Sequence, residues 1–385
     1  MYIWVIIYIT NILDNFKGLG VRKDFIKALD GLNITKPTEV QILSIPLLLS
    51  AKTDLVVQAQ TGTGKTAAFG LPLLQGTDSS RSEIQGLILC PTRELGQQIA
   101  KQLFRFTKFS DPIFTEAVYG GEKIDRQISS LRRPTHIVVA TPGRLIDLLK
   151  RKALSLKKVK TVILDEADEM LSMGFQKELN QILDFMSKDT NKWLFSATMP
   201  HSIKEIIKNH LSSDAQRVET SGKTRVNQNI QHKYFVCDED EKLHTLMKFV
   251  NSQHKKRGII FCRTKRATQH LAKQLIAKNV SVDAIHGDLQ QKEREKVLRA
   301  FKKENLQIIV ATDIAARGLD IEALSYVAHY QLPESEEYYT HRSGRTARAG
   351  REGVSMAFVT TNERNKLMDY EKSLSISFER IWDQN

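Results

Sequence analysis

Short apolar runs rich in β-branched residues alternate along this chain with longer amphipathic stretches. In the first half, the predicted strands include 55–58, 87–90, 137–140, 161–164 and 193–195. In the second half, they include 258–261, 308–311, 326–328 and 355–359. Continuously apolar runs are typical of strands that are buried on both faces of a parallel sheet. The pattern therefore predicts an α/β fold, in which helices flank a parallel sheet in each half.

The chain is long enough for two domains of average size, since it has 385 residues. Hydrophobic residues make up 41% of it, which is enough for a buried core in each half. A polar stretch rich in Ser, Thr, Asn and Gln separates the halves. We therefore predict a first domain at 16–211, a linker at 212–228, a second domain at 229–377 and a tail at 378–385.

Residues 1–15 begin with an apolar run that is too short to span a bilayer. The run has no basic region before it and no small-residue cleavage site after it. We therefore favour a misassigned translation start upstream of Phe16 over a signal peptide or a membrane anchor. The next methionine is Met170, so such a start requires a non-AUG codon. Mass spectrometry of the native N-terminus tests this, and a mature chain that carries Tyr2 and Trp4 would contradict it.

The chain is basic, with 57 Lys and Arg residues against 44 Asp and Glu residues, and a net charge of +13. Such a surplus favours a polyanionic partner, because each neutralised phosphate releases a counterion. A merely soluble basic protein fits the charge equally well. Cys90, Cys237 and Cys262 are isolated and lack metal-ligand spacing, which indicates a reducing compartment, here the cytoplasm.

A candidate phosphate-binding loop follows the strand at 55–58 and precedes a helical stretch. Its glycines let successive backbone N–H groups face the phosphates of a nucleotide. We expect Lys65 to pair with the β- and γ-phosphates and Thr66 to hold Mg²⁺. The expected nucleotide-binding residues of this loop are Ala59, Gln60, Thr61, Gly62, Thr63, Gly64, Lys65 and Thr66. Ala59 stands where the general pattern has glycine.

A second candidate motif, Asp-Glu-Ala-Asp, directly follows the strand at 161–164. An aspartate at the carboxyl end of an apolar strand is how a metal ligand reaches a bound nucleotide. We assign Asp165 as that ligand, directly or through water, and Glu166 as the base that orients and deprotonates the attacking water. Taken alone, the motif fits an acidic helix N-terminus better. Its position downstream of a phosphate loop favours the catalytic assignment.

These motifs resemble those of DEAD-box RNA helicases, and the resemblance extends from Phe16 to about Lys372. It implies two tandem RecA-like domains that bind ATP and RNA. Residues 36–41 resemble the family's adenine-recognition motif, which implies that Gln41 contacts adenine through its amide and that Lys36 belongs to the ATP site. Phe16 lies 25 residues before Gln41 and is expected to pack nearby. Ile34 replaces an aromatic residue often found there, so base stacking is expected to be weaker.

The resemblance also assigns residues of the second half to the ATP site. Residues 341–348 look like the family's last motif, which implies that Arg345 and Arg348 stabilise charge on the γ-phosphate. Their i, i+3 spacing would place them on one face if the segment were helical. The 311–320 segment resembles the other interdomain motif, in which Gly318 and Asp320 approach the nucleotide. Residues 196–198 are expected beside the acidic motif, where they would link ATP state to domain closure.

The remaining motifs suit a sugar-phosphate backbone, because small hydroxyls, glycine amides and arginines hold phosphates without reading bases. By resemblance, the RNA-binding residues are Pro91, Thr92, Arg93, Gly121, Thr141, Arg144, Arg263, Thr264 and Thr312, with Gly120 beside them. Gln291 and Arg294 are expected chiefly to bridge motifs. No aromatic residue interleaves the basic motifs in sequence, so we predict sequence-tolerant binding with little base stacking. The preference for RNA over DNA rests on the resemblance.

We therefore predict an ATP- and Mg²⁺-dependent RNA helicase that is monomeric and is not bound to a membrane. RNA-stimulated ATP hydrolysis would be coupled to domain closure and to local unwinding of short duplexes. Two alternatives remain: an ATP-gated RNA clamp in a larger assembly, and a DNA helicase or translocase of the same superfamily. A simple GTPase is less favoured, because no guanine-reading motif is present.

Overall fold

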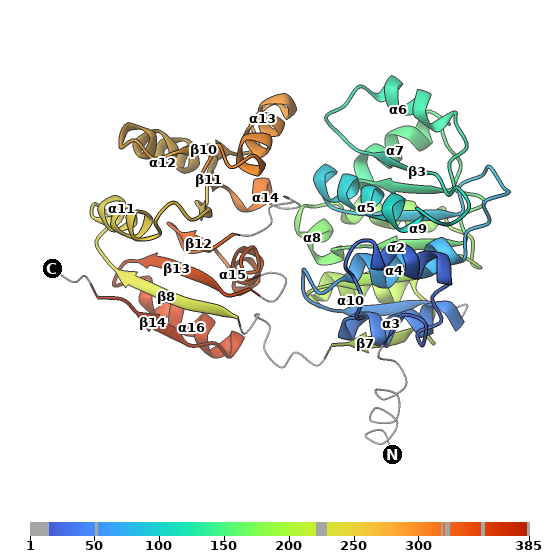
Figure 1. Ribbon diagram of the computed structural model, residues 1–385, viewed down its shortest axis with the longest axis horizontal. Helices are drawn as coiled ribbons and strands as arrows, with labels where there is room; N and C mark the ends of the chain where they lie inside the picture. The colour runs from blue at the N-terminus through green and yellow to red at the C-terminus, as the bar shows by residue number, and fades with distance from the viewer. Residues whose placement is uncertain are drawn as a thin grey trace, which may run out of the picture. The chain divides into compact units, whose positions relative to one another are not determined.

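The protein divides into two compact units, residues 1–221 and 222–385, and each is described by itself (Figure 1). The computed structural model describes residues 15–50, 53–220, 229–316, 319, 324–347 and 351–382. Each unit contains one seven-stranded sheet in which all strand pairs are parallel. The predicted α/β fold with two parallel sheets is therefore confirmed.

The first unit is built on a sheet with the strand order β3-β4-β2-β5-β6-β1-β7. The strands are β1 Leu55–Gln58, β2 Gly86–Leu89, β3 Thr115–Val118, β4 Ile137–Ala140, β5 Thr161–Leu164, β6 Asn191–Ser196 and β7 Gln216–Glu219. Strands β2, β4 and β5 are buried along their whole length, as the continuous apolar runs predicted. Successive residues point to opposite faces, so each apolar strand supplies two cores.

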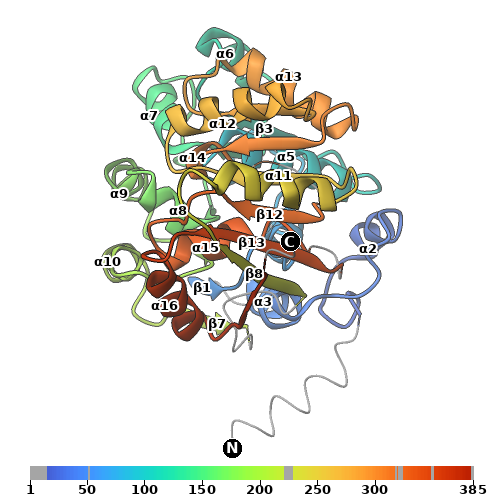
Figure 2. The same ribbon diagram turned by 90° about the vertical axis from the view of Figure 1, so that its left-hand side faces the viewer.

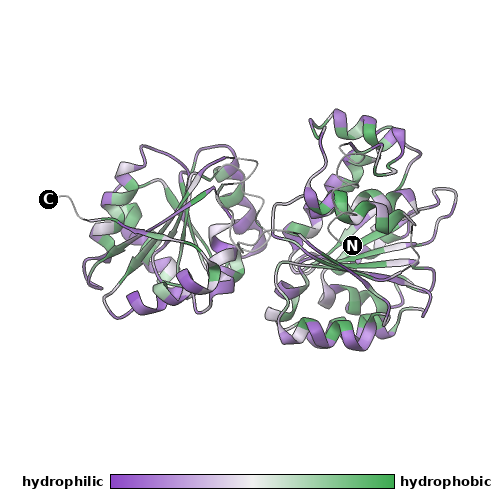
Figure 3. Ribbon diagram, turned by 90° about the horizontal axis from the view of Figure 1, so that it is seen from below, coloured by the Kyte–Doolittle hydropathy of each residue, from purple (hydrophilic) through white to green (hydrophobic). Residues whose placement is uncertain are grey.

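Helices cover both faces of the first sheet. One face packs against α2 Lys23–Asp30, α3 Glu39–Ser50, α4 Lys65–Gln75 and α5 Arg93–Phe106. The other packs against α6 Ile124–Leu131, α7 Pro142–Lys150, α8 Ala167–Ser172, α9 Gln176–Asp184 and α10 His201–His210. In β4, Val139 faces the first layer and Val138 faces the second. Figure 3 shows the resulting pattern, with hydrophobic residues along the strands and hydrophilic residues on the outer helix surfaces.

The second unit repeats this plan with the strand order β10-β11-β9-β12-β13-β8-β14. Its strands are β8 Ile230–Val236, β9 Gly258–Phe261, β10 Val282–Ile285, β11 Ile308–Ala311, β12 Tyr326–His329, β13 Gly353–Val359 and β14 Phe378–Arg380. One face packs against α11 Lys242–Ser252 and α12 Lys265–Ala277. The other carries α13 Gln291–Lys302, α14 Asp313–Ala316, α15 Glu336–Ser343 and α16 Arg364–Leu374. Helices α15 and α16 lie side by side (Figure 2).

The structure corrects two stretches predicted to lie outside the domains. Gln216–Glu219, in the predicted linker, forms β7 and pairs with β1. Phe378–Arg380, in the predicted tail, forms β14 and pairs with β8. Both are short edge strands whose side chains are mostly exposed or half-buried, so they lack the apolar run of an interior strand. Residues 221–228 of the predicted linker, and residues 1–14, lie outside the described residues.

Three further strands, β3, β8 and β10, were not among those predicted. Strands β3 and β10 are edge strands and keep half-buried or exposed residues. Strand β8 lies inside its sheet, but only alternate residues at its start are buried. In none of the three does the sequence show a continuous apolar run. Among the described residues, no helix is both long and apolar enough to cross a membrane.

Candidate functional site

The predicted motifs of the first unit follow the carboxyl ends of its strands. Because the strands are parallel, these ends lie along one edge of the sheet, which is where open α/β sheets bind ligands. In sheet order, Gly121 follows β3, Thr141 follows β4, Thr92 follows β2, Asp165 follows β5, Ser196 ends β6 and the 59–66 loop follows β1. The acidic motif therefore lies between the predicted RNA-binding loops and the phosphate-binding loop.

The phosphate-binding loop curls back on itself before α4 begins at Lys65. Gly62 and Gly64 have φ angles of 83° and 92°, in the left-handed region that favours glycine. The Lys65 side chain is buried, and its Nζ donates to the carbonyl oxygen of Ala59, 3.1 Å away. The ammonium group therefore lies across the mouth of the loop, at the N-terminal end of a helix, where backbone N–H groups and the helix dipole favour phosphate.

Gln41 is a buried residue of α3 that contacts this loop. Its Nε2 donates to the carbonyl oxygen of Gly64 at 3.0 Å, and its Oε1 accepts from the Thr38 N–H at 3.0 Å. One amide hydrogen and one lone pair remain available to a base. Two other residues were predicted for the adenine site. Phe16 is buried in the same core layer as α3, whereas Lys36 is exposed.

We predict that Gly64→Ala lowers the free energy of unfolding more than Gly62→Ala does. Both substitutions place alanine at a positive φ, which costs about 1–2 kcal/mol. A Cβ at position 64 would also lie 2.5 Å from Gln41 Nε2, whereas one at position 62 meets nothing within 4 Å. Urea denaturation without nucleotide measures the difference. Equal losses in the two variants would show that the Gln41 side chain moves away from the new Cβ without a loss of stability.

Asp165 is buried at the end of β5, and its carboxylate accepts a hydrogen bond from the Glu166 N–H at 3.0 Å. Burial, together with the charge of the neighbouring Glu166, raises the pKa of Asp165 to about 7, and the positive charge of Lys65 opposes this rise. Glu166 is buried as well and has a left-handed backbone, with φ of 51°. Two buried carboxylates near a lysine form the kind of group in which perturbed pKa values accompany catalysis.

The 196–198 segment lies beside the acidic motif, as predicted. Asp168 accepts hydrogen bonds from the N–H and the hydroxyl of Thr198, at 2.9 and 2.8 Å. Ser196 in turn donates its hydroxyl to the carbonyl oxygen of Thr198 at 2.7 Å. Since Asp168 lies in the first turn of α8 and Ser196 ends β6, these bonds join two segments about thirty residues apart in sequence.

The metal predicted for this site fits the residues present. In the described part of the chain, no group of three or more His, Cys, Asp and Glu residues could hold a metal ion. Mg²⁺ bound with a nucleotide needs only one or two protein oxygens, because water and phosphate supply the other ligands. The carboxylate of Asp165 and the hydroxyl of the half-buried Thr66 are oxygen ligands of the required kind. Both belong to motifs at the same edge of the sheet.

At the other end of this edge, an aromatic residue supports one of the predicted RNA-binding arginines. The guanidinium of Arg93 lies over the ring of Tyr119, 4.5 Å from its centroid, and Gln97 donates to the Tyr119 hydroxyl at 2.8 Å. Tyr119 follows a different strand from Arg93, so a search for aromatic residues among the basic motifs could not find this contact. Tyr119 is only 8% exposed, so it positions Arg93 and offers little surface to a base.

Arg144 is held in a similar way by the loop that follows β3. Its Nη1 donates to Gln127 Oε1 at 2.7 Å, and its Nη2 donates to the carbonyl oxygen of Glu122 at 2.9 Å. The 121–127 segment and Arg144 thereby form one unit, with Gly121 exposed at a φ of 81°. Thr92 and Thr141 precede α5 and α7 as N-cap residues, and Pro91 is buried before Thr92.

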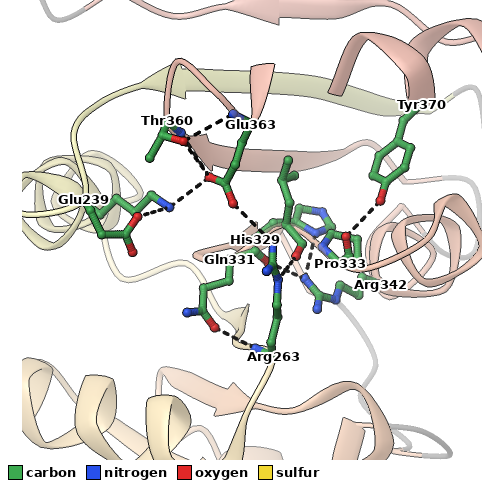
Figure 4. Close-up of polar contacts among 11 residues, drawn as sticks. Glu239, Arg263, His329, Gln331, Pro333, Arg342, Thr360, Glu363 and Tyr370 are labelled. Carbon is green, nitrogen blue, oxygen red and sulfur yellow. Dashed lines mark hydrogen bonds and ion pairs between the residues drawn. The ribbon is translucent and has the colours of Figure 1, made fainter. Parts of the chain in front are cut away.

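In the second unit, Arg263 follows β9 and belongs to a polar network (Figure 4). Its Nε donates to the carbonyl oxygen of Leu332 at 2.6 Å, and its Nη2 lies 3.3 Å from Glu363 Oε1. Glu363 also pairs with the buried Lys242 at 3.1 Å. Thr264 is exposed and caps α12 by accepting the Ala267 N–H at 3.1 Å. The network fixes the direction of an exposed arginine, which suits a backbone contact.

The 311–316 segment is tied to both neighbouring motifs of the second unit. Thr312 is buried after β11, and Asp313 pairs through both carboxylate oxygens with Arg342 of α15. Arg294 of α13 donates to the carbonyl oxygen of Ala315 at 2.8 Å, so it bridges motifs as predicted. Gly318 and Asp320, which were predicted to approach the nucleotide, lie outside the described residues.

The structure does not support a helical arrangement of the predicted arginine pair. Helix α15 ends at Ser343, Gly344 caps it, and the buried Arg345 lies in the turn that follows. Thr346 then forms an isolated parallel bridge with Leu324, so the chain is no longer helical after Ser343. Arg348 itself lies outside the described residues.

Two residues that hold predicted site segments in place, Arg342 and Tyr119, were not identified from the sequence, because their partners are distant in the chain. Arg342 is 1% exposed, and besides Asp313 it donates to the carbonyl oxygen of Gln331 at 2.8 Å. Its guanidinium also lies 5.0 Å from the centroid of the Phe261 ring. The only available signal was its place in the basic 341–348 motif. For Tyr119, the signal was its place directly before the Gly120-Gly121 pair.

A network of uncharged histidines lies beneath α15. His232 Nδ1 shares a hydrogen bond with the Tyr339 hydroxyl at 2.7 Å, and His329 Nε2 shares one with Ser355 at 2.9 Å. The rings of His329 and Tyr339 stack at a centroid distance of 4.6 Å. Burial lowers the pKa of His232 to about 4, and burial together with Arg342 holds the pKa of His329 well below its usual range.

We predict that His232 destabilises the protein as the pH falls from 6.5 towards 4. In that window the unfolded chain gains a proton that the folded chain does not, which costs about 2 kcal/mol by pH 4.5. His232→Gln removes this titration, so wild type should lose stability relative to the variant between pH 7.5 and 4.5 in urea denaturation. The exposed His270→Gln should follow wild type at every pH, and a constant wild-type advantage over His232→Gln would contradict the assignment.

The parallel sheets and the phosphate-binding loop define a P-loop ATPase with two α/β units. Residues 38–206 match the model of the DEAD/DEAH box helicase family, and residues 241–350 match that of the helicase conserved C-terminal domain. The DEAD-box ATP-dependent RNA helicase CshA of Bacillus cereus (strain ATCC 10987 / NRS 248) is 39% identical over 369 residues, which cover 96% of this chain and 70% of that protein. CshA of Bacillus subtilis (strain 168) is 39% identical over 366 residues, which cover 95% of this chain and 74% of that protein.

A solved structure gives the same result. S. cerevisiae Dbp5 bound to RNA and ADP BeF3 is 30% identical, has a TM-score of 0.87, and is matched over 96% of this chain and 95% of that one. The chain therefore belongs to the DEAD-box ATP-dependent RNA helicase family, as its motifs predicted.

Proposed function

We propose that this protein hydrolyses ATP in response to RNA and uses the reaction to separate short RNA duplexes or to remodel RNA–protein complexes. The observation that carries the proposal is the shared sheet edge of the first unit. There the acidic motif lies between the phosphate-binding loop and the loops of Arg93 and Arg144. Nucleotide and RNA would then bind along one edge of one rigid sheet.

We assign the individual roles as follows. Lys65 binds the β- and γ-phosphates, Gln41 contacts adenine, and Asp165 with Thr66 holds Mg²⁺, which neutralises charge on the phosphates. Glu166 orients the attacking water and accepts its proton. Arg345 and Arg348 of the second unit stabilise charge on the transferred phosphoryl group. The positions of these residues in the matched motifs support the assignments, and substitution of each residue can test them.

The RNA contacts are proposed to be made to the backbone. Arg93 and Arg144 are held by side-chain and carbonyl partners, so their charges point in fixed directions. Fixed cations lose little conformational entropy on binding phosphate. We also propose that the protein works in the cytoplasm, since all three cysteines are buried and remain free thiols.

We predict that Arg144→Gln weakens RNA binding and leaves ATP binding unchanged. Losing one charge-assisted phosphate contact should reduce affinity roughly tenfold and lower the slope of log affinity against log salt by about 0.7. Fluorescence anisotropy with a labelled single-stranded RNA over a salt series measures both quantities. The exposed Arg81→Gln serves as the matched control. An equal effect in both variants would show that only net charge matters.

The test of the proposed function is the steady-state ATPase rate without nucleic acid, with single-stranded RNA, and with single-stranded DNA of the same sequence. Strong stimulation by RNA alone is expected and would justify unwinding assays on short duplexes. Equal stimulation by DNA would favour a DNA helicase or translocase. Stimulation followed by slow product release and long-lived complexes with intact ATP would favour an ATP-gated RNA clamp.

A further inference from the structure

A large cavity opens at the opposite edge of the first sheet from the phosphate-binding loop. Its volume is about 870 Å³, and it lies between α2, the end of α5, the 107–114 loop and the end of α6. Strand β3 begins at Thr115 in its wall, and Pro134 and Thr135 in the same wall lead into β4. The cavity is therefore formed at the amino ends of strands, whereas the motifs of the first unit follow the carboxyl ends.

Exposed phenylalanines surround this cavity. Phe104 and Phe114 line it and are 73% and 53% exposed, and Phe109 beside them is 40% exposed. The Phe114 ring stacks on His136 at 5.6 Å, and the Phe114 N–H donates to His136 Nδ1 at 2.9 Å. A group of exposed aromatic side chains around a cavity marks an interaction surface, and an anchor such as Phe114 that is already held by a neighbour loses less entropy on binding.

Positive residues outnumber negative ones around the cavity, although the exposed Asp111 lies in the 107–114 loop. Arg105, Lys108 and Arg133 line the cavity and are exposed, and the Lys27 ammonium lies 4.4 Å from the centroid of the Phe109 ring. Glu116 is the one acidic residue in the lining, and it is half-buried within the cavity. A binding partner would therefore place apolar groups inside and negative charges at the rim.

We propose that this surface binds a peptide segment of a partner protein in which large apolar side chains are flanked by Asp or Glu. The apolar side chains enter the cavity against Phe104 and Phe114, and the carboxylates pair with Arg105, Lys108 and Arg133. RNA fits less well, because the inner wall of the cavity is apolar, with Leu32, Pro112 and Ile113 in its lining, and suits aliphatic or aromatic side chains better than a sugar-phosphate chain. This surface is separate from the proposed ATP and RNA residues of the first unit, so the inference goes beyond the proposed helicase activity.

The test is a selection from a displayed library of peptides about twelve residues long against the full chain. We expect the enriched peptides to combine aromatic or aliphatic residues with Asp and Glu. As synthetic peptides, they should bind Phe104→Ser and Phe114→Ser roughly tenfold more weakly than wild type. Phe185→Ser is the matched control, because Phe185 is 57% exposed in the same unit but lies outside the cavity, and it should bind like wild type.

Two further measurements test the proposed charge complementarity and the alternative that RNA binds this surface. Arg133→Glu should weaken the acidic peptides roughly tenfold, and Phe104→Ser should keep wild-type ATPase rates with and without RNA. Enriched peptides that are basic, or that bind all the phenylalanine variants equally, would overturn the proposal. A fall in RNA affinity in Phe104→Ser equal to the fall in peptide affinity would assign the surface to RNA instead.

Discussion

Glu166→Gln is expected to slow RNA-stimulated ATP hydrolysis by about 10²–10⁴-fold, because an amide cannot accept the proton of the attacking water. ATP binding should survive the change. Glu166 raises the pKa of the neighbouring Asp165, so removing its charge favours the ionised form of Asp165 that binds Mg²⁺. Single-turnover hydrolysis measures the chemical step, and anisotropy with a labelled ATP analogue measures binding.

Glu178→Gln is the matched control, since it makes the same carboxylate-to-amide change on α9, outside the sheet edge. It should hydrolyse ATP at the wild-type rate. A Glu166→Gln protein that turned over ATP at the wild-type rate would refute the assigned base. Loss of nucleotide binding in that variant would instead show that Glu166 shapes the metal site, since its backbone lies in the left-handed region before α8.

Arg342→Met is expected to lower the free energy of unfolding of the second unit by about 3 kcal/mol, the lower end of the cost of removing one partner of a buried ion pair, because Asp313 is partly exposed. Arg342 is almost fully buried, and its partner Asp313 would remain without its bidentate partner. The carbonyl oxygen of Gln331 would also lose a donor. Urea denaturation gives the free energy, and amide hydrogen exchange locates the loss in the second unit.

A second substitution distinguishes lost charge from lost packing. Asp313→Asn in the Arg342→Met background should recover part of the stability, because it removes the unpaired carboxylate. The exposed Arg266→Met on α12 should have little effect. If Arg342→Met costs no more than Arg266→Met, the pair contributes nothing to stability, and the 311–316 segment is held by Thr312 and Arg294 alone.

The stability of this pair matters for function because Asp313 opens the segment that leads to Gly318 and Asp320. Arg342 fixes Asp313, and Arg294 fixes Ala315, so two helices hold the segment in place. The neighbouring Arg345 follows α15 directly. A loss of Arg342 is therefore also expected to reduce ATP hydrolysis at temperatures where the protein remains folded, since the proposed γ-phosphate contact depends on the end of α15.

Much of the fold could be predicted because interior parallel strands are apolar on both faces. β1, β4, β5, β9 and β11 occur with the predicted bounds, and β2 is displaced by one residue. The edge strands β3, β7, β10 and β14 carry half-buried or exposed residues, so their sequences resemble loops. Their strand character comes from pairing with a neighbour that is distant in the chain, and sequence periodicity cannot report that pairing.

The sequence by itself determined the chemistry that is local in the chain. The 59–66 loop needs only its glycines and the helix after it, and the acidic motif needs only the strand before it. The loop was found from consecutive residues, and the acidic motif was recognised from its strand together with its position downstream of that loop. Tertiary structure alone decided which distant groups hold the functional side chains in place: Gln41 on the phosphate-binding loop, Tyr119 under Arg93 and Arg342 on Asp313. Each of these contacts joins residues that only strand pairing and helix packing bring together, because hydrogen bonds and ring contacts act over a few ångströms in space and are independent of separation along the chain.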